Sequence, residues 1–234
     1  MRPIERPLEP KEGRGQTTGE MISFGKHKDR GTGYSARSER VGPGVLVLHE
    51  FFGLTPSFKE KADRLNEAGF TALVPDLYDG RVASTVDEAR SLAQSLDEDT
   101  VMARLGAAAE HLTANWHPRL GVVGFSLGAA FAVELAKSRD VEAVALYYGM
   151  GEMPGPRWKS PVLGHFAEND EWESHEYIQS FFEALEEIGA DAESFVYPGT
   201  GHWFANPDVA EAYAPDAAEQ AWNRTIDFFS HHLA

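Results

Sequence analysis

The pentapeptide Gly124-Phe125-Ser126-Leu127-Gly128 sets a serine between two segments of different periodicity. The apolar run 120–123 before it is typical of a buried strand, and the alanine-rich run 129–137 after it is typical of a helix. A strand that turns this sharply into a helix is a nucleophile elbow, which exposes the serine hydroxyl at the carboxyl edge of a sheet. Glycines flank the serine because side chains would collide there. The pattern favours an α/β protein with Ser126 as nucleophile.

An acid and a histidine follow the serine in the chain order that hydrolases with this elbow use. The run 160–166 resembles another buried strand, and Asp170 lies in the loop after it. The segment 192–197 alternates like a last strand, and His202 follows in a glycine-rich turn. Each residue comes just after the carboxyl end of a predicted strand, where α/β sheets collect their chemistry. We therefore expect a Ser126, His202 and Asp170 triad, in which Asp170 orients the imidazole.

The same loop offers other acids. Glu168 and Glu171 flank Asp170 and remain alternatives for the acid. Asp170 is favoured because it lies toward the middle of the loop and has the shorter side chain. The expected acid is thus a choice among three carboxylates.

Other histidines compete less well with His202 for the role of base. His165 lies inside an apolar run, where a buried histidine with satisfied hydrogen bonds is the expected outcome. His231 and His232 lie near the end of the final predicted helix and are expected to be solvated. The alternative for His202 is an ordinary loop histidine that has no catalytic role.

Acyl transfer also needs hydrogen-bond donors that stabilise the oxyanion of the tetrahedral intermediate. The nearly continuous apolar strand 45–49 runs into the turn Glu50-Phe51-Phe52-Gly53-Leu54. One expected donor is the N–H of Leu127, directly after the serine, and the other is the N–H of Phe51 in this turn. Alternatively, Phe51 and Phe52 only pack beneath the following helix, and both roles are compatible.

Four further segments resemble motifs of a known protein family and occur in the same order along the chain. They are His49-Glu50-Phe51-Phe52-Gly53-Leu54, Val74-Pro75-Asp76-Leu77-Tyr78, Tyr147-Tyr148-Gly149 and Tyr197-Pro198-Gly199-Thr200-Gly201-His202-Trp203-Phe204. With the elbow and the loop around Asp170, they make the chain resemble the dienelactone hydrolase family of α/β-hydrolases, from about Gly19 to the C-terminus. The resemblance implies Ser126, Asp170 and His202 as the triad, with the Phe51 and Leu127 amides as the oxyanion hole.

The chain also departs from that family. Members that act on dienelactone use a cysteine nucleophile, whereas this chain has no cysteine, so a thiol-directed role of Glu50 need not transfer. Those members hold the substrate carboxylate with two arginines. Arg81 matches one of them or is a solvated loop cation, and Asn206 stands at the position of the other. We expect Glu50, Arg81, Asn206 and Trp203 to bind the substrate or shape the site.

The composition limits which classes of molecule the chain is expected to bind. The formal net charge is −16, from 37 acidic and 21 basic residues, which disfavours nucleic acids and anionic membranes. The first twenty residues contain no apolar secretion-signal core, and no run reaches transmembrane length, so a cytoplasmic location is expected. A monomer or small homo-oligomer is expected. Neither a cofactor nor a metal is predicted. A zinc site formed by His49, His165 and His202 is an alternative that the other roles of these residues disfavour, and the elbow lacks the spacing of a dinucleotide-binding loop.

The predicted organisation is a flexible arm over 1–18, or alternatively an arm that drapes over the surface, and one α/β-hydrolase domain over 19–234. A strand pair is expected within 21–36, with its turn at 29–33, and the remaining strands alternate with helices. The other predicted strands are 45–49, 71–74, 121–123, 143–147, 161–166 and 192–197, and the predicted helices are 57–68, 86–96, 101–115, 129–137, 175–188 and 217–233. Such alternation predicts a doubly wound, mostly parallel sheet flanked by helices, without a lid domain.

The expected function is hydrolysis of a small-molecule ester or lactone through an acyl-enzyme on Ser126. Two alternatives remain from the sequence: an acyltransferase that uses the same acyl-enzyme, and a non-catalytic binding module with this fold.

Overall fold

A computed structural model describes residues 18–38, 41–115 and 117–234. The strands are β1 (Glu20–Phe24), β2 (Gly31–Ala36), β3 (Gly44–Leu48), β4 (Thr71–Pro75), β5 (Leu120–Phe125), β6 (Ala143–Tyr147), β7 (Val162–Asn169) and β8 (Ala192–Gly201). The helices are the 3₁₀ turn η1 (His27–Asp29), α1 (Pro56–Glu67), α2 (Val86–Gln94), α3 (Glu98–Asn115), α4 (Leu127–Ser138), α5 (His175–Glu187) and α6 (Pro215–His232).

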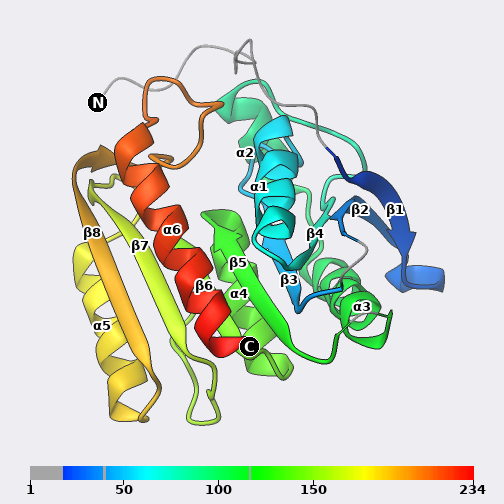
Figure 1. The fold of residues 1–234 in the computed structure, drawn as a ribbon. Helices are drawn as coiled ribbons and strands as arrows, with labels where there is room; N and C mark the ends of the chain where they lie inside the picture. Colours follow the sequence, from blue (N-terminus) through cyan, green and yellow to red (C-terminus); the bar gives the residue numbers. More distant parts are fainter. Residues whose placement is uncertain (1–17, 39–40, 116) are drawn as a thin grey trace.

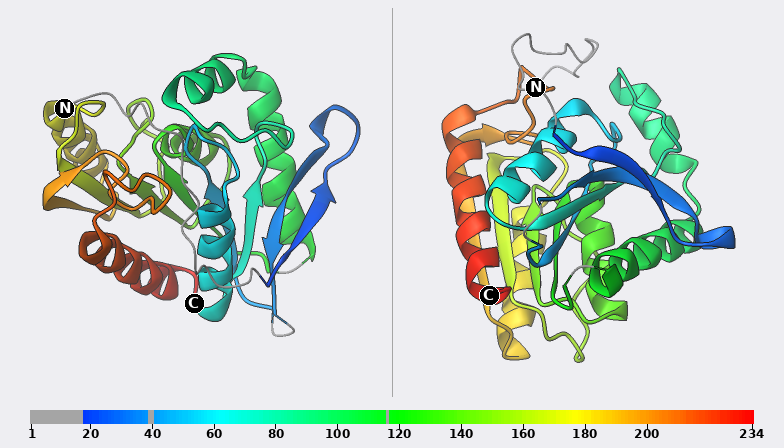
Figure 2. Two further views of the ribbon diagram at one scale, coloured as in Figure 1. Left: turned by 90° about the horizontal axis from the view of Figure 1, so that it is seen from above. Right: turned by 45° about the vertical axis from the view of Figure 1, so that its right-hand side comes forward.

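The described strands form one sheet in the order β1-β2-β4-β3-β5-β6-β7-β8. From β4 to β8 every neighbouring pair is parallel, whereas β1 and β2 pair antiparallel and β2 runs antiparallel to β4. Helices cover both faces: α1 and α6 lie on one, and α3, α4 and α5 lie on the other (Figure 1, Figure 2). The predicted α/β-hydrolase sheet is confirmed, and no described segment forms a separate lid domain.

The apolar runs of the sequence become the centre of this sheet. Every residue of β3, β4, β5 and β6 is buried, because helices on both faces exclude water from parallel strands. Side chains that alternate along these strands enter two cores, one on each face. Parallel strands that lie side by side end at the same edge, so the segments after β3, β5, β7 and β8 meet there.

Several predicted boundaries were wrong. β7 extends to Asn169, so Glu168 belongs to the strand and not to the loop. β8 continues to Gly201 through residues predicted as a turn, with a register irregularity opposite 167–169. The turn of the first strand pair lies before Gly31, which already begins β2, because η1 occupies 27–29. Helix α3 begins at Glu98, three residues earlier than predicted.

The predicted arm over 1–18 lies outside the described residues except for its last residue. Thr18 is held by Asp63 of α1: its N–H donates to Oδ2 over 3.1 Å and its hydroxyl donates to Oδ1 over 3.0 Å. This contact fits the alternative that the arm lies over the surface of the domain. Of the described helices, none combines the length and the apolar character that crossing a bilayer requires.

Candidate active site

Ser126 lies at the junction of β5 and α4 in a conformation that few serines adopt. Its φ is +49° and its ψ is −115°, outside the common regions for an L-residue. Two contacts hold it there: its N–H donates to the Tyr147 carbonyl over 2.9 Å, and its carbonyl accepts from the N–H of Ala129 over 2.8 Å. This is the strained strand-to-helix turn of a nucleophile elbow.

Close backbone approach explains the glycines of the elbow. A Cβ on Gly124 would lie 2.4 Å from the Gly128 carbonyl oxygen, and a Cβ on Gly128 would lie 2.2 Å from that of Leu48. Neither position has room for a side chain. The second contact also places the end of β3 directly against the elbow.

We predict that Gly128→Ala lowers the free energy of unfolding by about 1–3 kcal/mol or more, because its methyl group would displace backbone. Gly155→Ala is the matched control, since a Cβ at that position meets no heavy atom within 4 Å, and a change within about 0.5 kcal/mol is expected. Urea unfolding of both variants measures the difference. Equal stabilities would contradict the close-approach argument.

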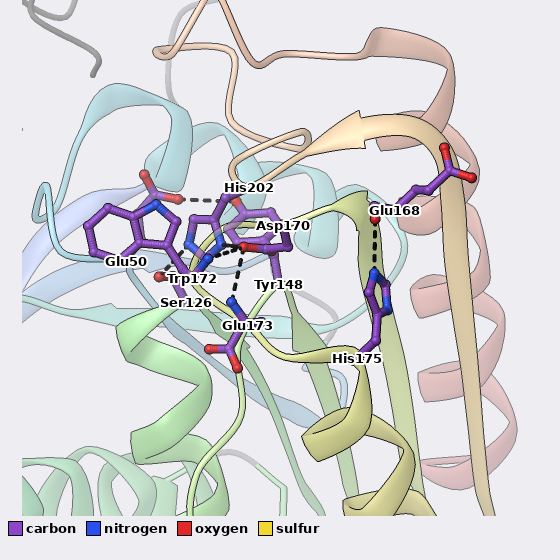
Figure 3. A network of polar contacts seen from close by, with 9 residues as sticks. All are labelled: Glu50, Ser126, Tyr148, Glu168, Asp170, Trp172, Glu173, His175 and His202. Atoms are coloured by element: carbon purple, nitrogen blue, oxygen red, sulfur yellow. Dashed lines mark hydrogen bonds and ion pairs between the residues drawn. The ribbon is translucent and has the colours of Figure 1, made fainter. Parts of the chain in front are cut away.

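The structure brings the three predicted triad side chains together (Figure 3). Ser126 Oγ lies 2.9 Å from His202 Nε2, and His202 Nδ1 lies 2.9 Å from Asp170 Oδ2 and 3.0 Å from Oδ1. The side chains of His202 and Asp170 are only 5% and 1% exposed. A carboxylate can only accept, so Asp170 keeps the proton on Nδ1 and leaves Nε2 free to accept from the serine hydroxyl.

The backbone after β7 fixes Asp170. Its Oδ1 accepts the N–H groups of Trp172 over 2.9 Å and of Glu173 over 3.2 Å. Glu168 instead points away from His202 in Figure 3, and its carboxylate accepts the Gly199 N–H over 2.8 Å. Glu171 is exposed. Among the three acids of this segment, only Asp170 is hydrogen-bonded to His202.

His165 takes the structural role that its apolar surroundings favour. Thr225 donates its hydroxyl proton to the Ala221 carbonyl, so its Oγ1 accepts from His165 Nε2 over 3.0 Å. His165 Nδ1 lies 3.0 Å from the Tyr197 hydroxyl. Burial and the Arg224 charge together lower the pKa of His165 to about 3, which keeps the ring neutral. These two bonds tie β7 to β8 through Tyr197 and to α6 through Thr225.

The expected oxyanion donors lie on the two segments that meet at the elbow. Leu127 is the first residue of α4, where backbone N–H groups lack helical acceptors. Phe51 lies in a turn closed by the bond from the Gly53 N–H to the Glu50 carbonyl over 3.1 Å. The turn follows β3, whose end contacts Gly128. The Phe51 side chain is also buried, so packing and backbone donation are compatible.

Glu50 is fully buried beside this turn, and its carboxylate has two donors. Asn206 Nδ2 donates over 2.5 Å and the Tyr148 hydroxyl over 3.1 Å. Burial raises the pKa of Glu50, whereas the bond from Asn206 and the Lys61 charge lower it. Asn206, at the position where the resemblance implies an arginine in members that act on dienelactone, is thus engaged with Glu50.

Lys61 of α1 was not identified from the sequence. Its ammonium lies 5.0 Å from the Phe58 ring centroid and 5.3 Å from that of Phe125, and burial lowers its pKa. The signal was available, because Lys61 falls on the apolar face that Phe58 and Leu65 define at helical spacing. It supplies positive charge close to Glu50.

Arg81 lies in a loop whose backbone contacts the turn after β3: a Cβ on Gly53 would lie 2.9 Å from the Arg81 carbonyl oxygen. Its side chain is exposed, and its Nε donates to the Tyr78 carbonyl over 3.2 Å within the loop between β4 and α2. The exposed side chain fits a solvated loop cation, and a role of Arg81 in substrate binding stays a prediction.

Aromatic rings surround the histidine. Trp203 is buried, and its ring stacks on Phe51 with centroids 5.6 Å apart and meets His202 edge-on at 4.8 Å. Trp172, which the sequence did not single out, is 52% exposed and lies 5.9 Å from the His202 ring. These rings form an apolar wall next to the triad.

Glu173 was also missed from the sequence. Burial raises its pKa to about 7, and the neighbouring Asp170 charge contributes in the same direction. Among the described residues, no three histidine, aspartate or glutamate side chains gather as a metal site. Glu173 adds a second carboxyl group near the triad, because its N–H is bonded to Asp170.

Comparison with known proteins identifies the family. The model of the dienelactone hydrolase family matches residues 32–233. The chain belongs to this family. A relative from Aquifex pyrophilus, named protein usf, is 31% identical over 229 residues, which cover 92% of this chain and 99% of the relative. The carboxymethylenebutenolidase of Rhodococcus opacus is 28% identical over 236 residues, with coverage of 91% and 92%.

Solved structures agree with the family fold. The dienelactone hydrolase-like promiscuous phosphotriesterase P91 from metagenomic libraries superposes with a TM-score of 0.82. The two chains are 24% identical, and the match covers 93% of this chain and 99% of the other. At this identity the likeness shows the fold of this dienelactone hydrolase family member.

Proposed function

We propose that the chain is a serine hydrolase that cleaves a small neutral ester or lactone through an acyl-enzyme on Ser126. The observation that supports this most is the continuous hydrogen-bonded path from Ser126 Oγ through His202 to Asp170. Family membership supports hydrolysis, and the name of the Rhodococcus opacus relative supports a lactone as one substrate. The cytoplasmic location and the oligomeric state stay predictions.

In the first half of the proposed reaction, Ser126 Oγ bonds to the carbonyl carbon while its proton passes to His202 Nε2. The carbonyl oxygen becomes an oxyanion, which accepts from the N–H groups of Phe51 and Leu127. The bond to the leaving oxygen then breaks, and that oxygen takes the proton from His202. The product is an ester of Ser126; in a lactone, the leaving alcohol stays attached to the acyl group.

In the second half, water replaces the leaving group. His202 takes a proton from the water as its oxygen attacks the acyl carbon, and Ser126 Oγ leaves with that proton. The carboxylic acid is released and the resting enzyme is restored. Asp170 stays ionised throughout and stabilises the imidazolium that forms in each half.

Covalent labelling tests the proposal directly. A fluorophosphonate probe should modify Ser126, as mapped by mass spectrometry of the digested protein. Ester turnover should fall in proportion to the fraction of Ser126 that is labelled. Labelling without turnover of any ester or lactone would instead indicate a binding module. Formation of a new ester when an alcohol is added would indicate acyl transfer to an acceptor other than water.

We predict that neutral substrates are preferred over the anionic dienelactone. Asn206 is engaged with Glu50, Arg81 is exposed, and Glu50 and Glu173 lie near the site. Loss of a charge-assisted contact costs about 1.5–3 kcal/mol, so kcat/KM for p-nitrophenyl acetate should exceed that for cis-dienelactone by about tenfold or more. Steady-state kinetics with both substrates measure this ratio.

Arg81→Ala is the control for that comparison, and its kcat/KM for p-nitrophenyl acetate should change by less than about threefold, because an exposed cation contributes little to a neutral ligand. A preference for dienelactone that disappears in Arg81→Ala would overturn the prediction.

A further inference from the structure

His49 is a fully buried residue outside the triad, at the point where β3 leads into the turn that contains Phe51. Its ring has two backbone partners. Nδ1 lies 2.7 Å from the Glu50 carbonyl oxygen, and the Leu77 N–H donates to Nε2 over 3.2 Å. It therefore joins the turn after β3 to the turn after β4.

These partners fix the tautomer of His49. A backbone N–H can only donate, so Nε2 must accept from Leu77, and the ring proton must be on Nδ1. Nδ1–H then donates to the Glu50 carbonyl. Burial lowers the pKa of His49, which keeps the ring in this neutral form.

The Glu50 carbonyl belongs to the same peptide unit as the Phe51 N–H. A trans peptide is planar, and its C=O and N–H bonds point in opposite directions. Two donors hold the carbonyl, His49 Nδ1 and the Gly53 N–H at 3.1 Å. Fixing the direction of the carbonyl fixes the opposite direction of the Phe51 N–H.

The turn is also held against the elbow. A Cβ on Gly128 would lie 2.2 Å from the Leu48 carbonyl oxygen and 2.7 Å from that of His49. The peptide that His49 orients thus follows directly on backbone that contacts the segment after Ser126.

We propose that His49 is a positioning residue, which holds the Glu50–Phe51 peptide so that the Phe51 N–H donates to the oxyanion formed on Ser126 attack. The inference rests on the proposed function and assigns His49 an effect on the transition state. A purely structural link between the two turns would affect stability alone.

Two substitutions of equal shape separate these effects. Leucine and asparagine both branch at Cγ, and the asparagine Nδ2 occupies the position of the histidine Nδ1. Both variants lose the acceptor for Leu77, but only His49→Asn keeps a donor for the Glu50 carbonyl. The difference between them therefore isolates the bond that orients the peptide.

For His49→Leu we expect kcat to fall by about 10- to 100-fold, below the full loss of an oxyanion donor, while KM changes less than about threefold. His49→Asn should recover kcat to within about fivefold of the wild type. If His49→Leu does not fold, His49→Gln replaces it, because its side-chain amide oxygen can accept from Leu77 while no donor stands at the Nδ1 position.

Inhibitor binding supplies a readout that a structural role would not change. Ser126 Oγ adds to the carbonyl carbon of a trifluoromethyl ketone and forms a hemiketal. The former carbonyl oxygen of this adduct occupies the oxyanion site. Its inhibition constant should rise in His49→Leu by the same factor as kcat/KM falls. The corresponding secondary alcohol cannot form this adduct, and its affinity should be unchanged.

The outcomes separate the two proposals. Three results would overturn the role of His49 without affecting the proposed function. They are an unchanged kcat in His49→Leu (or in His49→Gln where that variant replaces it), a loss of kcat in His49→Asn as large as in that variant, and an unchanged ketone inhibition constant. A wild-type protein that forms no adduct with the ketone at Ser126 would overturn the proposed function, and the His49 inference with it.

Discussion

Replacement of Ser126 by alanine is expected to lower kcat for p-nitrophenyl acetate by about 10⁴-fold or more. The hydroxyl lies 2.9 Å from His202 Nε2, and serine and histidine act as one unit, so the loss of either removes nearly all of the nucleophilic pathway. The fold should persist, because alanine keeps the Cβ and the backbone bonds of the elbow. Steady-state kinetics, with circular dichroism to monitor folding, measure both results.

Ser180→Ala is the control for this variant. Ser180 is an exposed residue of α5, and its hydroxyl donates to the Glu176 carbonyl of its own helix. Its removal should leave kcat within about twofold, since surface substitutions away from a site change little. Near-wild-type turnover by folded Ser126→Ala would exclude the triad as the source of activity.

Asp170→Asn is expected to lower kcat by up to about 10⁴-fold while the protein stays folded. Oδ1 already accepts from the Trp172 and Glu173 N–H groups, so the asparagine oxygen should remain there and its NH₂ group should take the Oδ2 position. That NH₂ group would face His202 Nδ1 at 2.9 Å and require it to accept. The ring proton then moves to Nε2, which can no longer take the serine proton.

Glu168→Gln is the matched control in the same segment. The glutamine oxygen can still accept the Gly199 N–H, so kcat should change by less than about threefold. Steady-state kinetics of both variants under the same conditions show which of the two carboxylates is the acid of the triad. If Glu168→Gln is the damaging change and Asp170→Asn is mild, Asp170 is not the acid of the triad.

The choice among carboxylates shows where local sequence becomes insufficient. Glu168 and Asp170 are two residues apart, and side chains at that spacing point the same way only while a strand continues. β7 extends to Asn169 and has an irregular register against β8 near this point. Its end therefore separates the directions of the two carboxylates, and strand pairing determines where that end lies.

Asn206 shows a second limit. Alignment with the family motif locates this residue, but its partner Glu50 lies 156 positions earlier in the chain. The pair forms because the turns after β3 and β8 meet above the same sheet edge. No local pattern predicts that the Asn206 amide is already engaged with a buried carboxylate.

Local sequence patterns predicted the sheet, the elbow and the order of the triad candidates. Apolar runs, helical periods and the Gly-x-Ser-x-Gly spacing are local properties, and they act over distances of a few residues. Long-range packing sets which acid contacts His202 and buries Lys61 near Glu50. It also brings His49 to the Glu50 carbonyl and the Leu77 N–H. Such contacts depend on strand length, register and the approach of separate turns, which the packing of the whole sheet fixes.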